Sequence, residues 1–293
     1  MRDRLTWERD GLDWPNRDSS RFVDAAGLRW HVQMMGDGPV ILLVHGTGAA
    51  THSWRTLMPM LANEFTVVAP DLPGHGFTTA PPDAGLSLPG MSTALIALLR
   101  ALEVEPVLGV GHSAGAAVLA HMSFDDQESF KGLISLNGAL LPLHGLAGHL
   151  FSPLAKLFAV NSIVPRLFAL RAENPAMVER MIRQTGSTID PVGIKLYEKL
   201  ARNPCHVAAA LGMMANWDLR FLDQNLPQLK PYLMLVTGTN DRTVAPYYSM
   251  QVRAVVPSSE LVSLKGLGHL AHEERPAAIH ELVLPLASKL NIL

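Results

Sequence analysis

The 293-residue chain contains one cysteine, Cys205, and an unusually small share of charged side chains. One cysteine excludes a disulfide framework within the chain, and no Cys/His spacing is typical of a zinc site. We expect Cys205 to be a small buried residue and not a nucleophile. Charged residues make up 17% of the chain, the formal net charge is −2, and there is no basic, aromatic-rich patch. These features argue against a nucleic-acid partner.

The sequence also lacks an apolar leader and a long uninterrupted apolar run. Residues 1–10 are rich in charge and contain no apolar signal core, so we expect a cytoplasmic protein. Residues 132–155 contain no Lys, Arg, Asp or Glu, but Pro142 and Pro153 interrupt them, and residues 133–136 are typical of a buried strand. We therefore expect no transmembrane span.

The most informative motif that is present is Gly111-His112-Ser113-Ala114-Gly115. An apolar strand is predicted at 106–110 and a buried helix at 116–122. A G-x-S-x-G sequence between strand and helix is typical of a nucleophile elbow, in which the serine occupies a sharp, strained turn. Short Gly/Ser motifs also form ordinary turns, so the prediction of Ser113 as a nucleophile depends on finding a base and an acid.

An acid and a base follow the elbow in the chain order that this architecture requires, which is serine, acid, histidine. Residues 231–238 predict a buried strand, and Asp241 lies just beyond its end. Residues 260–264 predict another strand, which leads into a glycine-flanked loop carrying His269. We predict that His269 is the general base and that Asp241 orients its imidazole.

Other residues compete for these two roles. Asp218 and Asp223 precede the strand at 231–238 instead of following it, so Asp241 is the better acid. His272 is close to His269, but its sequence is typical of the entry to the final helix. His269 is therefore the preferred base.

A second loop supplies a predicted oxyanion hole. Residues 40–44 predict a strand, and His45-Gly46-Thr47-Gly48 follows it. Glycines let the backbone approach a substrate, so the backbone N–H groups of Thr47 and Ala114 are predicted to bind a developing oxyanion. In isolation, the same four residues would be explained equally well by a plain glycine turn. We expect His45, and His75 in the next loop, to be structural.

Together these motifs resemble the α/β-hydrolase superfamily, whose landmarks they match in order: 45–48, 71–76, 111–115, 238–241 and 268–269. The resemblance implies an α/β fold with a mostly parallel central sheet, helices on both faces and an inserted helical cap. A closer likeness is to the magnesium-chelatase accessory proteins of bacteriochlorophyll biosynthesis, and it lies in residues 137–142, 145–156 and 213–219. That family implies a role beside magnesium insertion into protoporphyrin in phototrophic bacteria, but it supplies no established reaction.

The landmarks divide the chain into a first core part at 1–137, a helical cap at 138–222 and a second core part at 223–293. A chain of this length suits one α/β domain with an insertion. Residues 1–21 are interpreted as an arm, and residues 175–184 as an amphipathic helix of the cap.

The cap holds nine Lys/Arg and five Asp/Glu, which gives this segment a net charge of +4. A basic cap over an apolar pocket would suit an amphiphilic carboxylate such as a porphyrin with propionates. A solvated helix face is the simpler explanation of the same charges. The apolar residues 140–151 are open to three interpretations: ordinary cap core, a lipophilic pocket wall, or an interfacial contact with a membrane.

Four residues are named as substrate-binding candidates: Trp54, Asn137, Asn216 and Trp217. Trp217 could stack on a flat ring. His144 or His149 could ligate a magnesium tetrapyrrole axially, which is a weaker hypothesis. We predict no bound cofactor and no protein metal site.

Two hypotheses about function follow. The first is a serine hydrolase that cleaves an ester, a thioester or a carbon–carbon bond through an acyl-enzyme, acting on a small amphiphilic or apolar substrate such as a tetrapyrrole. The second is a non-catalytic porphyrin-binding or magnesium-chelatase accessory protein on a hydrolase scaffold. Magnesium chelatase is the partner that both hypotheses suggest.

Overall fold

The computed structural model describes residues 4–125, 130–142 and 163–293. Its centre is an eight-stranded sheet with the order β1-β2-β4-β3-β5-β6-β7-β8. Pairing is parallel from β4 to β8, whereas β2 runs antiparallel to both β1 and β4. The strands are β1 (Ser20–Ala25), β2 (Leu28–Met35), β3 (Val40–Val44), β4 (Thr66–Pro70), β5 (Leu108–His112), β6 (Gly132–Leu136), β7 (Tyr232–Gly238) and β8 (Glu260–Leu264).

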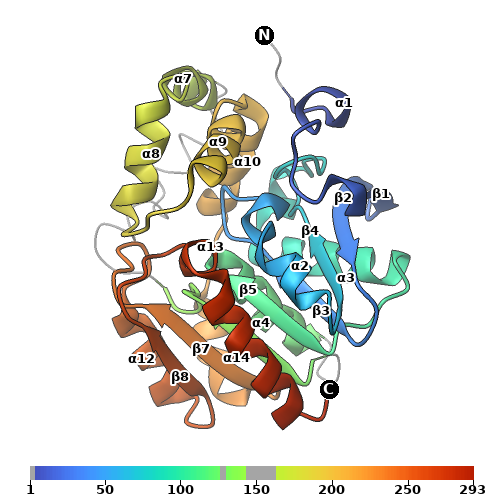
Figure 1. Cartoon of the computed structure of the whole chain (residues 1–293), viewed down its shortest axis with the longest axis vertical. Helices are drawn as coiled ribbons and strands as arrows, with labels where there is room; N and C mark the ends of the chain where they lie inside the picture. The colour runs from blue at the N-terminus through green and yellow to red at the C-terminus, as the bar shows by residue number, and fades with distance from the viewer. Residues whose placement is uncertain (1–3, 126–129, 143–162) are drawn as a thin grey trace.

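The central strands are apolar on both sides because helices cover both faces of the sheet. In β3, Ile41 and Leu43 join one buried cluster, while Leu42 and Val44 join the other. Figure 1 shows α2 (Leu57–Leu61) and α14 (Pro276–Lys289) in front of the strands. The opposite layer contains α3 (Leu88–Ala101), α4 (Ala114–Asp125) and α12 (Pro246–Val255). The predicted fold class is confirmed.

Five helices lie between β6 and β7 in the described part of the chain: α7 (Ile163–Arg171), α8 (Pro175–Gln184), α9 (Pro191–Ala201), α10 (Pro204–Ala215) and α11 (Arg220–Asn225). The first four of them are gathered at the top of Figure 1, beyond the sheet. Asn174, Asp190 and Asn203 cap α8, α9 and α10 through their side chains, with proline following each cap. The predicted helix at 175–184 matches α8. The division at residues 138 and 222 stays a prediction.

Two smaller expectations need correction. Residues 4–19 pack against the core instead of forming an arm: Trp14 is 2% exposed, and its Nε1–H donates to Thr51 Oγ1 at 3.0 Å. Lys199 of α9 also donates from Nζ to the carbonyl of Asp10 at 2.7 Å. Cys205 lies in the first turn of α10 and is exposed, whereas its neighbour His206 is buried.

No helix within residues 4–125, 130–142 and 163–293 is both long and apolar enough to cross a bilayer.

A buried Asp–His hydrogen bond joins β2 to the loop after β4. Asp71 and His31 have no solvent-exposed side-chain surface, and His31 Nδ1 lies 2.7 Å from Asp71 Oδ2. The Asp71 carboxylate also accepts the backbone N–H groups of Thr51 and Phe77 at 2.7 and 2.9 Å. Burial alone would raise the pKa of Asp71, but His31 and these donors lower it well below its usual value. Asp71 thus fixes the loops on the cap side of the sheet.

Replacing Asp71 by alanine should be strongly destabilising, because His31 and two backbone N–H groups would stay buried without an acceptor. We expect the free energy of unfolding to fall by about 3–5 kcal/mol, the usual loss when one partner of a buried pair is removed. Urea denaturation measures the change. Asp24→Ala, at an exposed position of β1, is the control and should stay within about 0.5 kcal/mol of wild type. A loss below about 1 kcal/mol for Asp71→Ala would contradict this account.

Candidate active site

Ser113 lies between the end of β5 and the start of α4 in a left-handed backbone conformation, with φ of +52°. This conformation is uncommon for a residue with a side chain. It is held by the N–H of Ser113, which donates to the Leu136 carbonyl at 3.0 Å. Glycine is required two residues later, because a Cβ on Gly115 would lie 2.1 Å from the Val44 carbonyl oxygen. The half-buried hydroxyl is thereby presented at the carboxyl end of the sheet.

Asp241 lies on the turn after β7, and both of its carboxylate oxygens are fully engaged. Oδ1 accepts the backbone N–H groups of Thr243 and Val244 at 2.7 and 2.9 Å. Oδ2 accepts Asn137 Nδ2 at 2.6 Å and His269 Nδ1 at 2.8 Å. Hydrogen bonds of this kind stabilise the ionised form of a carboxylate.

His269 is fixed at both its ring and its backbone. Because Asp241 can only accept as a carboxylate, His269 Nδ1 carries the proton, and its Nε2 is left as the basic nitrogen. His112 Nε2–H donates to the His269 carbonyl at 3.0 Å, and the His269 N–H donates to the Thr185 carbonyl at 3.4 Å. Asp241 and His269 thus form an oriented acid–imidazole pair, and the turn that carries His112 also carries Ser113.

The loop after β3 runs directly against the elbow. A Cβ on Gly46 would lie 2.9 Å from Ser113 Cβ and 2.9 Å from His112 Nδ1, so only glycine fits there. The next residue, Thr47, is the predicted oxyanion donor. Within the described part of the chain, the backbone N–H groups of Thr47 and Ala114 donate to no protein acceptor. Their role as donors to a substrate oxygen stays a prediction.

The competing histidine, His272, has a different environment. It lies in the short helix α13 (Ala271–Glu274), and neither of its ring nitrogens has a hydrogen-bond partner among the described residues. Its ring packs on Trp54 and His112 at centroid distances of 4.7 and 4.4 Å. Burial, together with the nearby His269 and Arg55, lowers the pKa of His272 to about 3. The acid is therefore paired with His269 and not with this neutral side chain.

Two of the substrate-binding candidates are buried, and their contact with a substrate stays a prediction. Trp54 is 0% exposed and lies in the apolar layer between the sheet and α2 and α14. Asn137 is 1% exposed, and its side chain is directed to Asp241. Its proximity to the end of β6 was apparent in the sequence, but its contact with a residue 104 positions later was not.

The other two substrate-binding candidates lie at the end of α10. Asn216 forms the C-terminal cap of this helix, and its Nδ2 donates to the Gly212 carbonyl at 2.8 Å. Trp217 is largely buried and belongs to the same apolar cluster as Ala114. Their contact with a substrate stays a prediction. His144, His149 and most of residues 140–151 lie outside the described residues.

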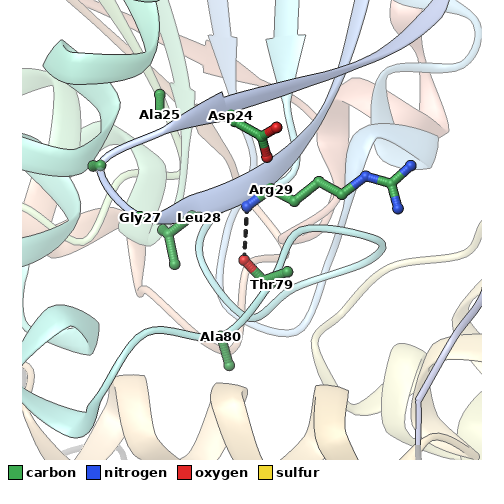
Figure 2. Close-up of a pocket in the computed structure, with 8 residues that line it drawn as sticks. Asp24, Ala25, Gly27, Leu28, Arg29, Thr79 and Ala80 are labelled. Atoms are coloured by element: carbon green, nitrogen blue, oxygen red, sulfur yellow. Dashed lines mark hydrogen bonds between the residues drawn. The ribbon is translucent and has the colours of Figure 1, made fainter.

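Neither a metal centre nor the hollow drawn in Figure 2 offers a competing site. Among residues 4–125, 130–142 and 163–293, no group of three or more His, Cys, Asp or Glu could hold a metal ion. The hollow, of about 600 Å³, is lined by residues 24–29 of the β1–β2 hairpin together with Thr79 and Ala80. Arg29 N–H donates to Thr79 Oγ1 there at 2.9 Å. Ser113, Asp241 and His269 do not line it.

His206, a buried residue of α10, is not marked by any sequence motif. Its ring contacts Gly76 at Nδ1 and Gly48 at Nε2, both at 3.1 Å. The Asn203-Pro204 dipeptide signals the start of this helix, but no local pattern identifies partners more than 100 residues away.

Comparison with known proteins agrees with this fold. The model of the alpha/beta hydrolase family matches residues 41–282. The chain belongs to this family.

Individual relatives extend over almost the whole chain. The magnesium-chelatase 30 kDa subunit of Rhodobacter capsulatus is 32% identical over 93% of this chain and 95% of its own length. The 2-hydroxy-6-oxo-2,4-heptadienoate hydrolase of Pseudomonas putida is 25% identical over 92% and 96%. An alpha/beta hydrolase fold protein from Burkholderia ambifaria superposes with a TM-score of 0.73, at 24% identity over 91% and 99%. The sequence resemblance to the chelatase-associated family is thus confirmed.

The depressed pKa of His272 predicts acid destabilisation. As the pH falls from about 6.5 to 3, the unfolded chain takes up a proton that buried His272 refuses, so the free energy of unfolding decreases. His272→Phe keeps an aromatic ring at this position and removes that contribution. We expect wild type to lose about 2 kcal/mol more than the variant between pH 7 and pH 4.5, measured by urea denaturation. Equal losses in the two proteins would contradict the neutral, buried state of His272.

Proposed function

We propose that this chain is a serine hydrolase in which Ser113 is the nucleophile, His269 the general base and Asp241 the orienting acid. The observation that carries the proposal is the 2.8 Å contact between Asp241 Oδ2 and His269 Nδ1 beside a left-handed serine turn. This contact leaves the basic nitrogen of His269 available for the serine proton. The order of the three residues along the chain matches the elbow architecture.

In the acylation step, Ser113 Oγ attacks the carbonyl carbon of the substrate while its proton passes to His269 Nε2. The carbonyl oxygen becomes an oxyanion, which the backbone N–H groups of Thr47 and Ala114 bind. Collapse of the tetrahedral intermediate breaks the bond to the leaving group, which takes the proton from His269. Asp241 stabilises the transient imidazolium, and Ser113 is left acylated.

Deacylation repeats the same steps with water. His269 Nε2 removes a proton from water, whose oxygen attacks the acyl carbon and forms a second oxyanion in the same hole. Collapse returns the proton from His269 to Ser113 Oγ and releases the carboxylic acid. The sequence of events suits an ester or a thioester. A carbon–carbon bond is suitable when a carbonyl is adjacent to it and the leaving carbanion is stabilised.

The surroundings of Ser113 favour an apolar acyl group or ring. The buried residues Leu140 and Leu141 follow Ala139, whose N–H donates to the Ser113 carbonyl at 3.0 Å, and Met213 Sδ accepts from Thr47 Oγ1 at 3.3 Å, so apolar side chains and a thioether lie near the elbow. The predicted cap carries a net +4 charge. An amphiphilic carboxylate, such as a tetrapyrrole with propionates, satisfies both properties.

We place the reaction in bacteriochlorophyll biosynthesis, in the cytoplasm beside magnesium chelatase. The support for this is the near-full-length similarity to the Rhodobacter capsulatus subunit. Magnesium chelatase is accordingly the proposed protein partner, and peripheral contact of the cap with a membrane would agree with an apolar substrate. The similarity to the Pseudomonas putida hydrolase keeps carbon–carbon cleavage among the candidate reactions.

Ser113→Ala separates this function from a non-catalytic accessory role. We expect wild type to be labelled covalently by a fluorophosphonate probe, and we expect the variant to lose labelling and at least about 10³-fold in hydrolytic rate. The variant should also fail to restore bacteriochlorophyll synthesis in a host that lacks its own copy. Pigment analysis and in-gel fluorescence provide the two measurements.

Ser123→Ala is the matched control, because Ser123 lies on the same helix α4 with its hydroxyl bonded to the Leu119 carbonyl at 3.0 Å. This variant should be labelled like wild type. Full restoration of pigment by Ser113→Ala would reject catalysis as the biological role and favour the accessory protein. Absence of labelling in wild type would reject Ser113 as an activated nucleophile.

A further inference from the structure

Helix α10 of the cap contacts two loops of the core through one histidine. His206 lies in the first turn of α10 and is 3% exposed. The N–H of Gly76 lies 3.1 Å from His206 Nδ1, and the carbonyl of Gly48 lies 3.1 Å from His206 Nε2. Gly76 belongs to the loop after β4, and Gly48 belongs to the loop that carries Thr47.

The two partners determine the protonation of the ring. A backbone N–H can only donate, so Nδ1 of His206 accepts from Gly76 and carries no proton. A backbone carbonyl can only accept, so Nε2–H donates to Gly48. His206 is therefore neutral, with a single tautomer. Burial, its largest influence, lowers the pKa of His206 to about 4, in agreement with this assignment.

A second residue of α10 contacts the same loop. Thr47 Oγ1 donates to Met213 Sδ at 3.3 Å. Met213 lies seven residues after His206, which is two helical turns, so both side chains project from the same side of α10. The loop between β3 and α2 is thus held by the cap at two consecutive residues.

The loop needs external support because its own sequence is permissive. Glycine precedes and follows Thr47, and Gly48 adopts a φ of +77°. Within the loop, the Ala49 N–H donates to the Gly46 carbonyl at 3.2 Å. This single hydrogen bond does not fix the direction of the Thr47 N–H. That direction depends on how the neighbouring peptide groups are held. An oxyanion donor is effective only when it is oriented before the reaction.

We propose that His206 is a positioning residue: its Nε2–H fixes the Gly48 carbonyl so that the Thr47 N–H faces the carbonyl oxygen of the substrate. The inference rests on the proposed oxyanion role of Thr47. In this proposal, α10 helps to stabilise the transition state in addition to forming part of the cap. His206 itself does not touch the substrate.

Two conservative variants separate the two hydrogen bonds. His206→Asn places an amide near the position of Nδ1 and keeps an acceptor for Gly76, but it does not reach Gly48. His206→Gln reaches the position of Nε2 and keeps a donor for Gly48, but it loses the bond with Gly76. Each variant retains one of two similar contacts, so a purely structural role predicts equal effects.

The first measurement is hydrogen–deuterium exchange of the peptide containing residues 46–49, which requires no catalytic activity. We expect faster exchange in His206→Asn and near-wild-type exchange in His206→Gln. The second is the rate of fluorophosphonate labelling of Ser113. It should fall about 10-fold or more in His206→Asn, a part of the loss expected when an oxyanion donor is removed. In His206→Gln it should stay within about 3-fold of wild type, because the contact to Gly48 is retained.

Equal exchange and equal labelling rates in the two variants would overturn the inference. If both variants fail to fold, Met213→Leu preserves the side-chain volume but removes the acceptor for Thr47, and it should raise exchange in the same peptide. Unchanged exchange in that variant would also count against positioning by α10. If wild type is not labelled at all, the proposed function fails, while the exchange comparison still decides whether His206 orders the loop.

Discussion

The left-handed backbone at Ser113 is the constraint on which the site depends. A serine with φ of +52° between a parallel strand and a helix can exist only where its neighbours leave room for the backbone. Gly115 lies against the carbonyl of Val44, and Gly46 lies against Ser113 and His112. The elbow and the loop after β3 are consequently in contact, which places the candidate nucleophile beside the candidate oxyanion donor. The buried parallel strands on either side of β5 hold the strained backbone of Ser113 in place.

Polar contacts then determine which histidine can act as a base. His269 is bonded to Asp241 through its ring and to His112 and Thr185 through its backbone. His272 is only three residues away, yet its burial among aromatic rings keeps it neutral and unpaired within the described residues. The imidazole of His269 is therefore hydrogen-bonded, whereas the imidazole of His272 contributes only to packing. Asn137, the second donor to Asp241 Oδ2, keeps the acid in place from the neighbouring strand end.

Much of this arrangement could be predicted from sequence, because its signals are local. The strands at 40–44 and 260–264 and the helix at 175–184 have the bounds that their apolar and capping patterns indicated. Asp241 and His269 were identified because each follows a strand in a fixed order after the serine. Contacts between distant segments could not be predicted this way. Trp54 was expected at the substrate but packs in the layer with α14. Trp14 bonds to Thr51 and Asp10 bonds to Lys199 of α9, and both partners are far along the chain. The bond from His206 to the oxyanion loop belongs to the same class.

Both the cap and the core contribute residues to the candidate site. The core carries the proposed nucleophile, base and acid, while α10 contacts the loop that carries the proposed oxyanion donor Thr47. The central claim is that Ser113 becomes covalently acylated. The most direct measurement is peptide mass mapping of protein quenched in acid during turnover of p-nitrophenyl acetate. We expect one acetyl group on the peptide containing Ser113 in wild type and none on that peptide in His269→Gln. Turnover of the ester without acetylation of Ser113, or equal acetylation in the two proteins, would contradict this claim.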